Sequence, residues 1–355
     1  MITKIELDSY KSFLNQPIDI APLTVLTGLN GSGKSTVIQA LRMITCASES
    51  KDNHFLSGYG DYEELRSRYN SKLNSKIKIS VHSKDHVHTL SVDKEKAQLE
   101  TPVDFISEYI SAERLGPQTN LPINATRRIS IGERGEFCAD YFNKFEACIV
   151  GDLLYREERV SKTLKEQLSC WMNDISPNID LEFSLDKKHD ISNVEIDGHR
   201  ATNTGFGISY ALPIVMSALV LSSKRCTDFK EQYVEDWYHM LSDKHKLLLI
   251  ENPEAHIHPS GQTQLGVLAV LAAKSGVQVI VETHSDHFID GIRIACKELN
   301  FNNKSLINYF TKDKDTPSSV EKITILDSGE LSNWPTGFFD QIQKNLSRLA
   351  ELNYG

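Results

Sequence analysis

The chain has 355 residues and a formal net charge of -9, which excludes a basic coat protein for nucleic acid but leaves room for local basic patches. Hydrophobic residues make up 40%, as in a globular protein, and no apolar run approaches the roughly 20 residues of a membrane helix. No signal peptide is visible at the N-terminus, so we expect a cytoplasmic protein without membrane contact. The six cysteines form no C-x-x-C pair, which predicts reduced thiols rather than a zinc site or a disulfide framework.

The first part of the chain predicts a strand, a glycine-rich loop and a helix in succession. Residues 4–7 alternate like an edge strand, and the apolar, β-branched residues 23–27 predict a buried strand. Residues 36–43 have helical spacing. Between the buried strand and the helix, residues 28–36 read GLNGSGKST and fit the phosphate-binding pattern G-x-x-x-x-G-K-[ST].

This loop has the residue types that bind a nucleotide phosphate. Glycines let backbone N–H groups close around phosphate oxygens, and the dipole of the following helix favours the anion. A lysine reaches the outer phosphates, and a serine holds Mg²⁺ through its hydroxyl. We therefore predict ATP and Mg²⁺ as cofactors. The predicted binding residues are Asn30, Gly31, Ser32, Gly33, Lys34, Ser35 and Thr36, with Ser35 as a metal ligand.

The middle of the chain predicts a less regular insertion. Polar residues over 47–76 predict loops with short helices, and alternation over 76–82 and 88–92 predicts a β-hairpin. Residues 134–174 are predicted to be mainly helical. The positions that give this helical spacing are Phe142, Phe145, Ile149, Leu153 and Leu154.

The last part of the chain alternates between buried strands and helices. Residues 247–251 and 277–281 are apolar runs that predict buried strands. Helices are predicted from Gly207 to Leu221 and over residues 262–273. Such alternation favours a parallel sheet covered on both faces.

Glu251 ends the first of these strands and is followed by NPEAHIHP over residues 252–259. With the phosphate loop, this segment resembles the ABC-type ATPases, and within them the SMC-like and OLD-like (overcoming lysogenization defect) ATPases of bacteria. The resemblance implies one α/β domain over 1–355: an ABC-ATPase-like P-loop fold with a mixed sheet core, helices on both faces and a helical-lobe insertion. The implied parts are core halves at 1–46 and 200–355, a hairpin and helical lobe at 47–199, and a tail at 320–355 that packs on the core.

The resemblance also implies roles for acidic residues and a histidine. Glu251 takes the Walker B position as a metal ligand and catalytic residue. Asn252 stands where relatives have the catalytic glutamate, so Glu254 becomes the candidate base, with a charge that favours a helix N-terminus as the alternative. His284, in the segment ETHS, takes the position of the switch histidine that binds the terminal phosphate.

A third segment, TGFGISY over residues 204–210, precedes an apolar helix and resembles the ABC signature sequence. By this resemblance Gly205, Gly207 and Ser209 contact the γ-phosphate bound by another subunit, so the active unit is a head-to-tail dimer or a higher homo-oligomer. The alternative is a simple turn at a helix start. Gln118 is a weak candidate for the magnesium-sensing glutamine, and Arg114 is either a phosphate ligand or an ion-paired residue.

Two features that relatives carry besides the ATPase domain, a coiled coil and a nuclease domain, bear on the function that the resemblance implies. No long coiled coil interrupts the chain, and 71 residues follow His284 (355 − 284), too few for the TOPRIM nuclease domain of OLD relatives. By resemblance, the chain is similar to stand-alone ATPase subunits of anti-phage systems such as Septu, PARIS and some retrons, which implies that it regulates a separately encoded nuclease or toxin.

Two alternatives stay open. The first is a DNA-repair ATPase that binds DNA directly, and the second is a nucleotide-dependent scaffold with little hydrolysis, which Asn252 keeps open. The candidates for DNA contact are Lys72, Lys76, Lys78, Arg127, Arg128 and Arg134.

Overall fold

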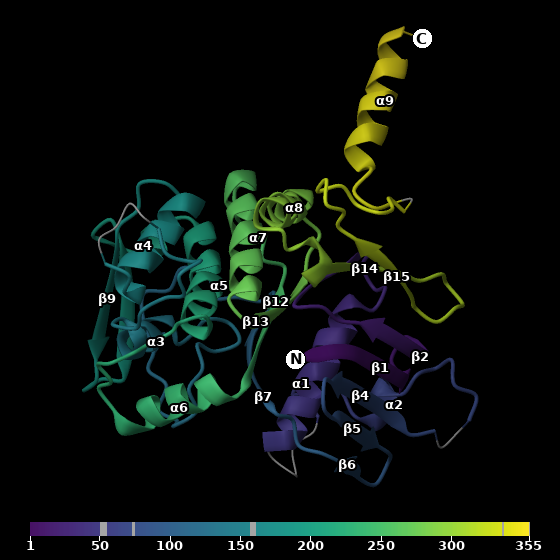
Figure 1. The fold of residues 1–355 in the computed structure, drawn as a ribbon, viewed down its shortest axis with the longest axis horizontal. Coiled ribbons are helices and arrows are strands. Elements are labelled where there is room, and N and C mark those ends of the chain that lie inside the picture. The colour runs from purple at the N-terminus through teal and green to yellow at the C-terminus, as the bar shows by residue number, and fades with distance from the viewer. Residues whose placement is uncertain (50–54, 73–74, 157–160, 336, 355) are drawn as a thin grey trace.

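The computed structural model describes residues 1–49, 55–72, 75–156, 161–335 and 337–354. Within them lie three sheets and the helices that cover them (Figure 1). The helices are α1 (Lys34–Glu49), α2 (Tyr62–Leu65), α3 (Cys138–Phe145), α4 (Leu164–Ile175), α5 (Phe206–Leu221), α6 (Gln232–Asp243), α7 (Pro259–Lys274), α8 (Asp286–Leu299) and α9 (Gln341–Tyr354). Short 3₁₀ turns occur at Ala201–Asn203 and Asn302–Lys304.

The central sheet has the strand order β15-β14-β3-β13-β12-β7. Its inner pairs are parallel, and β15 pairs antiparallel with β14 at one edge. The carboxyl ends of the parallel strands therefore meet at one edge, where ligands bind in open α/β sheets. The strands are β3 (Leu23–Gly28), β7 (Phe105–Ile110), β12 (His245–Glu251), β13 (Val277–Glu282), β14 (Ser305–Thr311) and β15 (Ser319–Thr324).

Both faces of this sheet are buried, which explains why its strands are continuously apolar. Val279 and Val281 pack into the core beneath α5 and α7, whereas Ile280 and Leu249 pack on the opposite face beneath α1. The predicted α/β fold, with a mixed sheet core and helices on both faces, is confirmed. The core sheet also includes β7, which lies inside the segment 47–199 that we expected to be an insertion.

A second sheet of antiparallel strands covers the α1 side, in the order β2-β1-β4-β5-β6. The predicted hairpin is present as β4 and β5. The prediction of an edge strand at residues 4–7 is wrong, because β1 pairs with β2 on one side and β4 on the other. The strands are β1 (Ile2–Tyr10), β2 (Phe13–Asp19), β4 (Ile77–Ser83), β5 (Val87–Val92) and β6 (Ala97–Leu99).

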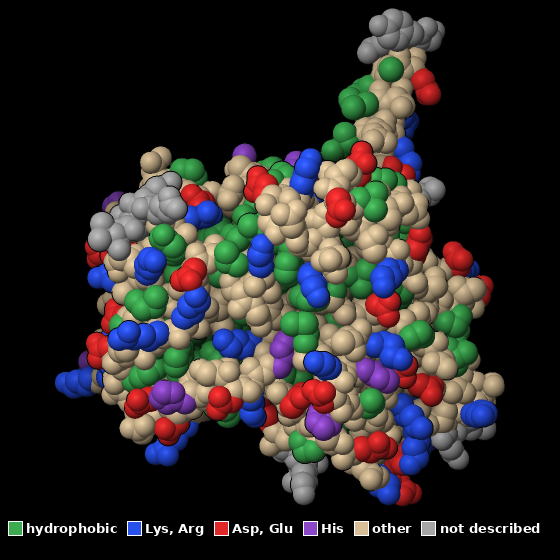
Figure 2. All heavy atoms as spheres, in the orientation of Figure 1, with side chains coloured by type: hydrophobic (Ala, Val, Ile, Leu, Met, Phe, Trp, Pro, Cys, Tyr) green, Lys and Arg blue, Asp and Glu red, His purple; other side chains and the backbone are tan. Residues whose placement is uncertain are grey.

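The tail over 320–355 divides into two parts. Phe338 is buried and packs edge-on against Tyr309 of β14. Beyond it, α9 stands out from the rest of the molecule (Figure 1), and hydrophobic side chains are visible on its surface (Figure 2). We had expected the whole of this tail to pack on the core. The exposed apolar side chains of α9 are Ile342, Leu346, Leu349 and Leu352.

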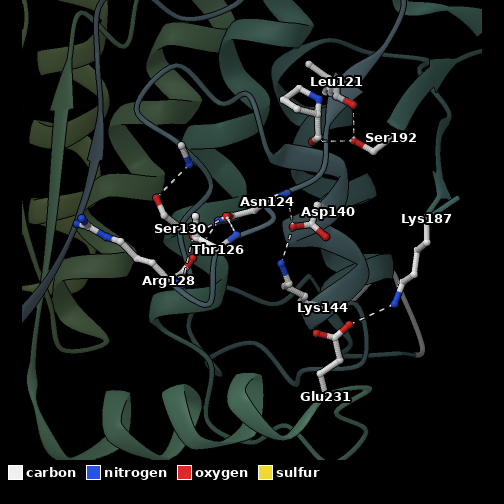
Figure 3. Close-up of polar contacts among 12 residues, drawn as sticks. Leu121, Asn124, Thr126, Arg128, Ser130, Asp140, Lys144, Lys187, Ser192 and Glu231 are labelled. Atoms are coloured by element: carbon white, nitrogen blue, oxygen red, sulfur yellow. Dashed lines mark hydrogen bonds and ion pairs between the residues drawn. The ribbon is translucent and has the colours of Figure 1, made fainter. Parts of the chain in front are cut away.

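A lobe made of α3, α4, α6 and a small sheet lies beside the central sheet (Figure 1). Figure 3 shows how the loop before α3 is attached to it: the Asn124 backbone N–H donates to the Asp140 carboxylate (3.3 Å), which also pairs with Lys144 at 2.5 Å. The Ser192 hydroxyl of β10 donates to the Leu121 carbonyl (3.2 Å). The strands of the lobe are β8 (Leu121–Pro122), β9 (Leu181–Asp186), β10 (Ile191–Ile196) and β11 (His199–Arg200).

Two sequence predictions fail in this lobe. Residues 134–174 are not one mainly helical stretch: α3 ends at Phe145, and Ile149 instead pairs by backbone bridges with Thr163 and Arg225. Leu153 and Leu154 also lie outside any helix, because side chains on an irregular segment that follows a core surface can be spaced like those of a helix. The prediction of six reduced thiols is wrong for Cys148 and Cys226, which form a disulfide.

Among the described residues, no helix has the length and apolar character needed to cross a membrane.

Candidate nucleotide-binding site

The phosphate loop connects β3 to α1 through backbone that requires glycine. Gly28 has φ 139°, and a Cβ there would lie 2.2 Å from the Phe310 carbonyl oxygen of β14. Gly33 has φ 107°, and a Cβ there would lie 2.7 Å from the Phe13 ring. A side chain at either position would meet both a disfavoured conformation and a neighbouring atom. The loop therefore keeps its backbone open at the carboxyl end of β3.

Lys34, the first residue of α1, is buried beneath this loop. Its ammonium donates to the carbonyls of Gly28 (3.0 Å) and Leu29 (2.9 Å) and lies 3.8 Å from a carboxylate oxygen of Glu282. Burial lowers the pKa of Lys34, and Glu282 partly opposes that effect. A bound phosphate would supply further negative charge beside this cation.

Glu282 is the carboxylate that sequence reasoning missed. It is the last residue of β13, the neighbour of β3, and it accepts a hydrogen bond from Ser35. Burial raises the pKa of Glu282 to about 7, although Ser35 and Lys34 both favour the ionised form. The signal available in the sequence was its position at the end of a buried strand, immediately before Thr283 and His284.

Glu251 ends β12 directly opposite Glu282, one strand further from the loop. Its carboxylate is hydrogen-bonded to Tyr109 and to the backbone of Ala112, and burial raises its pKa. Its charge also raises the pKa of Glu282, so the two carboxylates lie in one electrostatic environment. The structure thus pairs Ser35 with Glu282, whereas we expected Ser35 and Glu251 to hold the metal together.

Glu254 and His284 lie together, and Glu254 is hydrogen-bonded to the segment that carries His284. One oxygen of the Glu254 carboxylate accepts from the His284 backbone N–H (2.7 Å), and the other accepts from the Thr283 hydroxyl (2.8 Å). Glu254 therefore fixes the loop that presents the His284 ring. Desolvation and the charge of Lys34 lower the pKa of His284, so its imidazole is neutral at pH 7.

Asn252 and Arg114 shape the turn after β12. Asn252 has φ 45°, and its backbone N–H donates to the Glu282 carbonyl (2.9 Å). Arg114 is buried and donates to the carbonyls of Glu251 (2.7 Å) and Asn252 (2.6 Å). Arg114 thus binds the backbone carbonyls of the turn after β12.

These elements surround a cavity of about 500 Å³. Lys11 and Ser12, from the turn between β1 and β2, and Lys312, after β14, also line it, and sequence reasoning missed all three. Three of the lining residues are lysines, and their charge suits a polyanion such as a nucleoside triphosphate. The lining residues are Lys11, Ser12, Asn30, Gly31, Gly33, Lys34, Ser35, Thr36, Asn252, Glu282, His284 and Lys312.

The polar groups in this region fit Mg²⁺ and a nucleotide. Four buried oxygen atoms have no hydrogen-bond partner in the described part of the chain: the hydroxyls of Ser12 and Ser32, the Asn252 side-chain carbonyl and one Glu282 oxygen. Orphaned buried oxygens are costly unless a ligand, an ion or water satisfies them. Hydroxyl and carboxylate oxygens are the donors that Mg²⁺ prefers.

The signature-like residues do not line this cavity. Gly205 is the N-cap of α5, and Gly207 lies so close to the His256 carbonyl that a Cβ would be 2.7 Å away. Ser209 and Gln118 instead line a separate small cavity beneath α5. The chain therefore holds its own phosphate loop and its signature-like turn at different places.

Three sequence families match separate segments of the chain. Residues 4–111 match a sequence family described as AAA domain, and residues 141–289 match one described as AAA ATPase domain. Residues 302–349 match a family described as Protein of unknown function (DUF3696). A comparison with curated protein sequences found no match.

Among solved structures, the chain is similar to an SMC head bound to the C-terminal winged-helix domain of ScpA. The TM-score is 0.55 and the identity 14%, over 92% of this chain and 99% of the other. It is also similar to an SMC head with an extended coiled coil bound to the C-terminal domain of ScpA, derived from Pyrococcus furiosus (TM-score 0.51, 14% identity, 99% of each chain).

The fold is that of an SMC head. The two AAA matches, each over part of the chain, agree with an ATPase fold of this kind.

Proposed function

We propose that this chain binds and hydrolyses Mg-ATP in the cavity at the end of β3, as one of two heads that close around the nucleotide. The observation that carries the proposal is the convergence of Lys34, Ser35, Glu282 and His284 on one cavity that contains unpartnered buried oxygens. They come from the loop and helix after β3 and from the end of the adjacent β13.

The position of each residue in the cavity supports a separate role for it. Ser35 and Glu282 would hold Mg²⁺, with Glu251 adding negative charge from the next strand. Lys34 would offset charge on the phosphates. Glu254 positions His284 through its two hydrogen bonds, so His284 and not Glu254 faces the terminal phosphate.

The position of the signature-like turn supports dimerisation. Gly205 and Ser209 lie at the start of α5, away from the lining of the chain's own cavity. A helix N-terminus with small residues is suited to approach phosphate. A second head placed head-to-tail would bring this turn to the nucleotide that the first head binds, so each site is complete only in the pair.

We further propose that the pair regulates a separately encoded nuclease or toxin in anti-phage defence. The support is the sequence resemblance to OLD-like defence ATPases, and the fact that both similar SMC heads are bound to part of another protein, ScpA. The alternative, direct action on DNA, needs a basic face. Lys76 and Arg128 are paired with Asp93 and Glu49, and on the face in Figure 2 positive and negative side chains are interspersed.

The test is ATP turnover by the full chain and by Glu282→Gln, Glu254→Gln and Lys34→Ala variants. We expect turnover in the wild type that rises with protein concentration, and loss in all three variants. Wild-type protein that does not turn over ATP at any concentration would refute the enzyme and favour a scaffold. Salt-dependent DNA affinity, measured in parallel, would support the repair alternative. Co-purification of a nuclease or toxin from the host would support the defence role.

A further inference from the structure

Arg114 is a buried guanidinium that the proposed chemistry does not use. It is 2% exposed and donates three hydrogen bonds, all to backbone carbonyls: Ser111 (2.9 Å), Glu251 (2.7 Å) and Asn252 (2.6 Å). Its Nε–H is buried and has no partner among the described residues. Burial lowers the pKa of Arg114 to about 10, so the side chain is still charged at pH 7.

Such an arrangement is costly for a purely structural side chain. Desolvation of a buried charge costs free energy, and replacement of buried ion pairs by apolar side chains of similar volume is often neutral or stabilising. The particular use of this guanidinium is visible in its partners. Two of them are the carbonyls of Glu251, the last residue of β12, and of Asn252, which follows it and lines the nucleotide cavity.

The turn that Arg114 holds is conformationally specific and continues into the site. Asn252 has φ 45°, in the left-handed region that non-glycine residues seldom adopt. Its backbone N–H donates to the Glu282 carbonyl, and its own side-chain oxygen is buried without a partner at the cavity wall. A shift of Arg114 would therefore move Asn252 and the end of β13 together.

The other side of Arg114 contacts the start of α5. Its guanidinium lies over the Tyr210 ring, 5.0 Å from the centroid. The Tyr210 ring is 4.7 Å from His256, which in turn is 5.3 Å from Phe206, the first residue of α5. Phe206 is 53% exposed, so this cluster reaches the surface beside Gly205.

We infer that Arg114 is a positioning residue that couples the start of α5 to Asn252 and Glu282 at the nucleotide cavity. Docking of a second head against Phe206 and Gly205 moves Tyr210, and Arg114 transmits that movement to the turn after β12. The chain therefore binds ATP alone but sets its hydrolytic groups only when a second copy is docked. This inference rests on the proposed function.

The experiment uses full-length protein with Tyr210→Leu, which removes the ring, and Tyr210→Phe as the matched control that keeps it. Arg114→Met and Arg114→Lys form a second pair, since lysine keeps the charge but not the planar three-bond geometry. Two quantities are measured: affinity for a fluorescent ATP analogue at a protein concentration where the chain is monomeric, and turnover as protein concentration rises.

We expect Tyr210→Leu and Arg114→Met to keep the nucleotide affinity within about twofold. We expect both to lose about 10- to 100-fold of the concentration-dependent turnover, the range for a small misplacement of catalytic groups. Tyr210→Phe should match the wild type, and Arg114→Lys should stay impaired. A role in folding alone would lower affinity and turnover in parallel with the melting temperature.

The outcomes separate this inference from the proposed function. If wild-type turnover depends on concentration but Tyr210→Leu keeps that dependence unchanged, the coupling is wrong and the proposed function stands. If the wild type itself does not turn over ATP, both are overturned. If Arg114→Met does not fold, the Tyr210 pair still decides, because Tyr210 is only partly buried.

Discussion

Replacing Glu282 by glutamine should remove a pH-dependent loss of stability from the nucleotide-free protein. A carboxyl group whose pKa is higher in the folded than in the unfolded state gives stability that is complete below the unfolded pKa. That stability is lost as pH rises through the folded pKa. Burial raises the pKa of Glu282 from 4.5 to about 7, so the wild type should lose stability between about pH 4.5 and pH 7. The Glu282→Gln variant lacks this titration.

The expected size follows from the two pKa values. A shift from 4.5 to about 7 corresponds to about 3.4 kcal/mol in full, and about 2.5 kcal/mol of it falls between pH 5 and pH 8. For a chain of 355 residues, that is about 3 °C in melting temperature. The gap in melting temperature between variant and wild type should therefore widen by about 3 °C from pH 5 to pH 8, in the variant's favour.

Thermal melts in EDTA at both pH values measure this difference. Glu108→Gln is the matched control: Glu108 is buried on β7, and burial raises its pKa to about 7, but it does not line the nucleotide cavity. Both variants should reduce the pH dependence in EDTA. In a second set of melts, with Mg-ATP and without EDTA, only Glu282→Gln should abolish the stabilisation that Mg-ATP gives. Equal pH dependence in Glu282→Gln and wild type would refute the reasoning about a buried carboxyl beside Ser35.

The remaining predictions concern the loop, its lysine and the tail. Lys34→Ala should weaken ATP binding at least about tenfold in a titration calorimeter, because a charge-assisted contact to phosphate is lost; unchanged affinity would contradict the placement of phosphate at Lys34. Gly33→Ala should destabilise the protein by about 1–3 kcal/mol more than Gly31→Ala in urea unfolding, because Gly33 faces the Phe13 ring while open space surrounds Gly31. Equal urea midpoints for the two variants would argue against a close contact between the phosphate loop and Phe13. Leu346→Ser should change the free energy of unfolding by less than about 0.5 kcal/mol, since Leu346 is 61% exposed on α9. Phe338→Ala should lower it by about 3–5 kcal/mol, because Phe338 is buried. A large effect of Leu346→Ser would show that α9 packs on the rest of the molecule.

The sequence predicted those parts of the molecule that local pattern determines. The phosphate loop was identifiable because its glycines are required by positive φ values and close neighbours within one short segment. The strands around 247–251 and 277–281 were identifiable because they are buried on both faces and are therefore apolar throughout.

What the sequence did not predict depends on which strands are neighbours. Glu282 became part of the site because β13 lies beside β3, whereas Glu251 is one strand further away. Arg114 and Asn252 meet across 138 residues, which no periodicity reveals. Leu154 is fully buried on an irregular segment, so its spacing from Phe145 imitated a helix that the backbone does not form.

The most direct test of the central claim is the molar mass of the full chain in solution, measured by light scattering with and without Mg²⁺ and a non-hydrolysable ATP analogue. We predict that nucleotide at least doubles the mass of the wild type and leaves the Lys34→Ala variant unchanged. A wild-type mass that does not respond to saturating nucleotide would contradict an ATPase head that closes around ATP with a second copy.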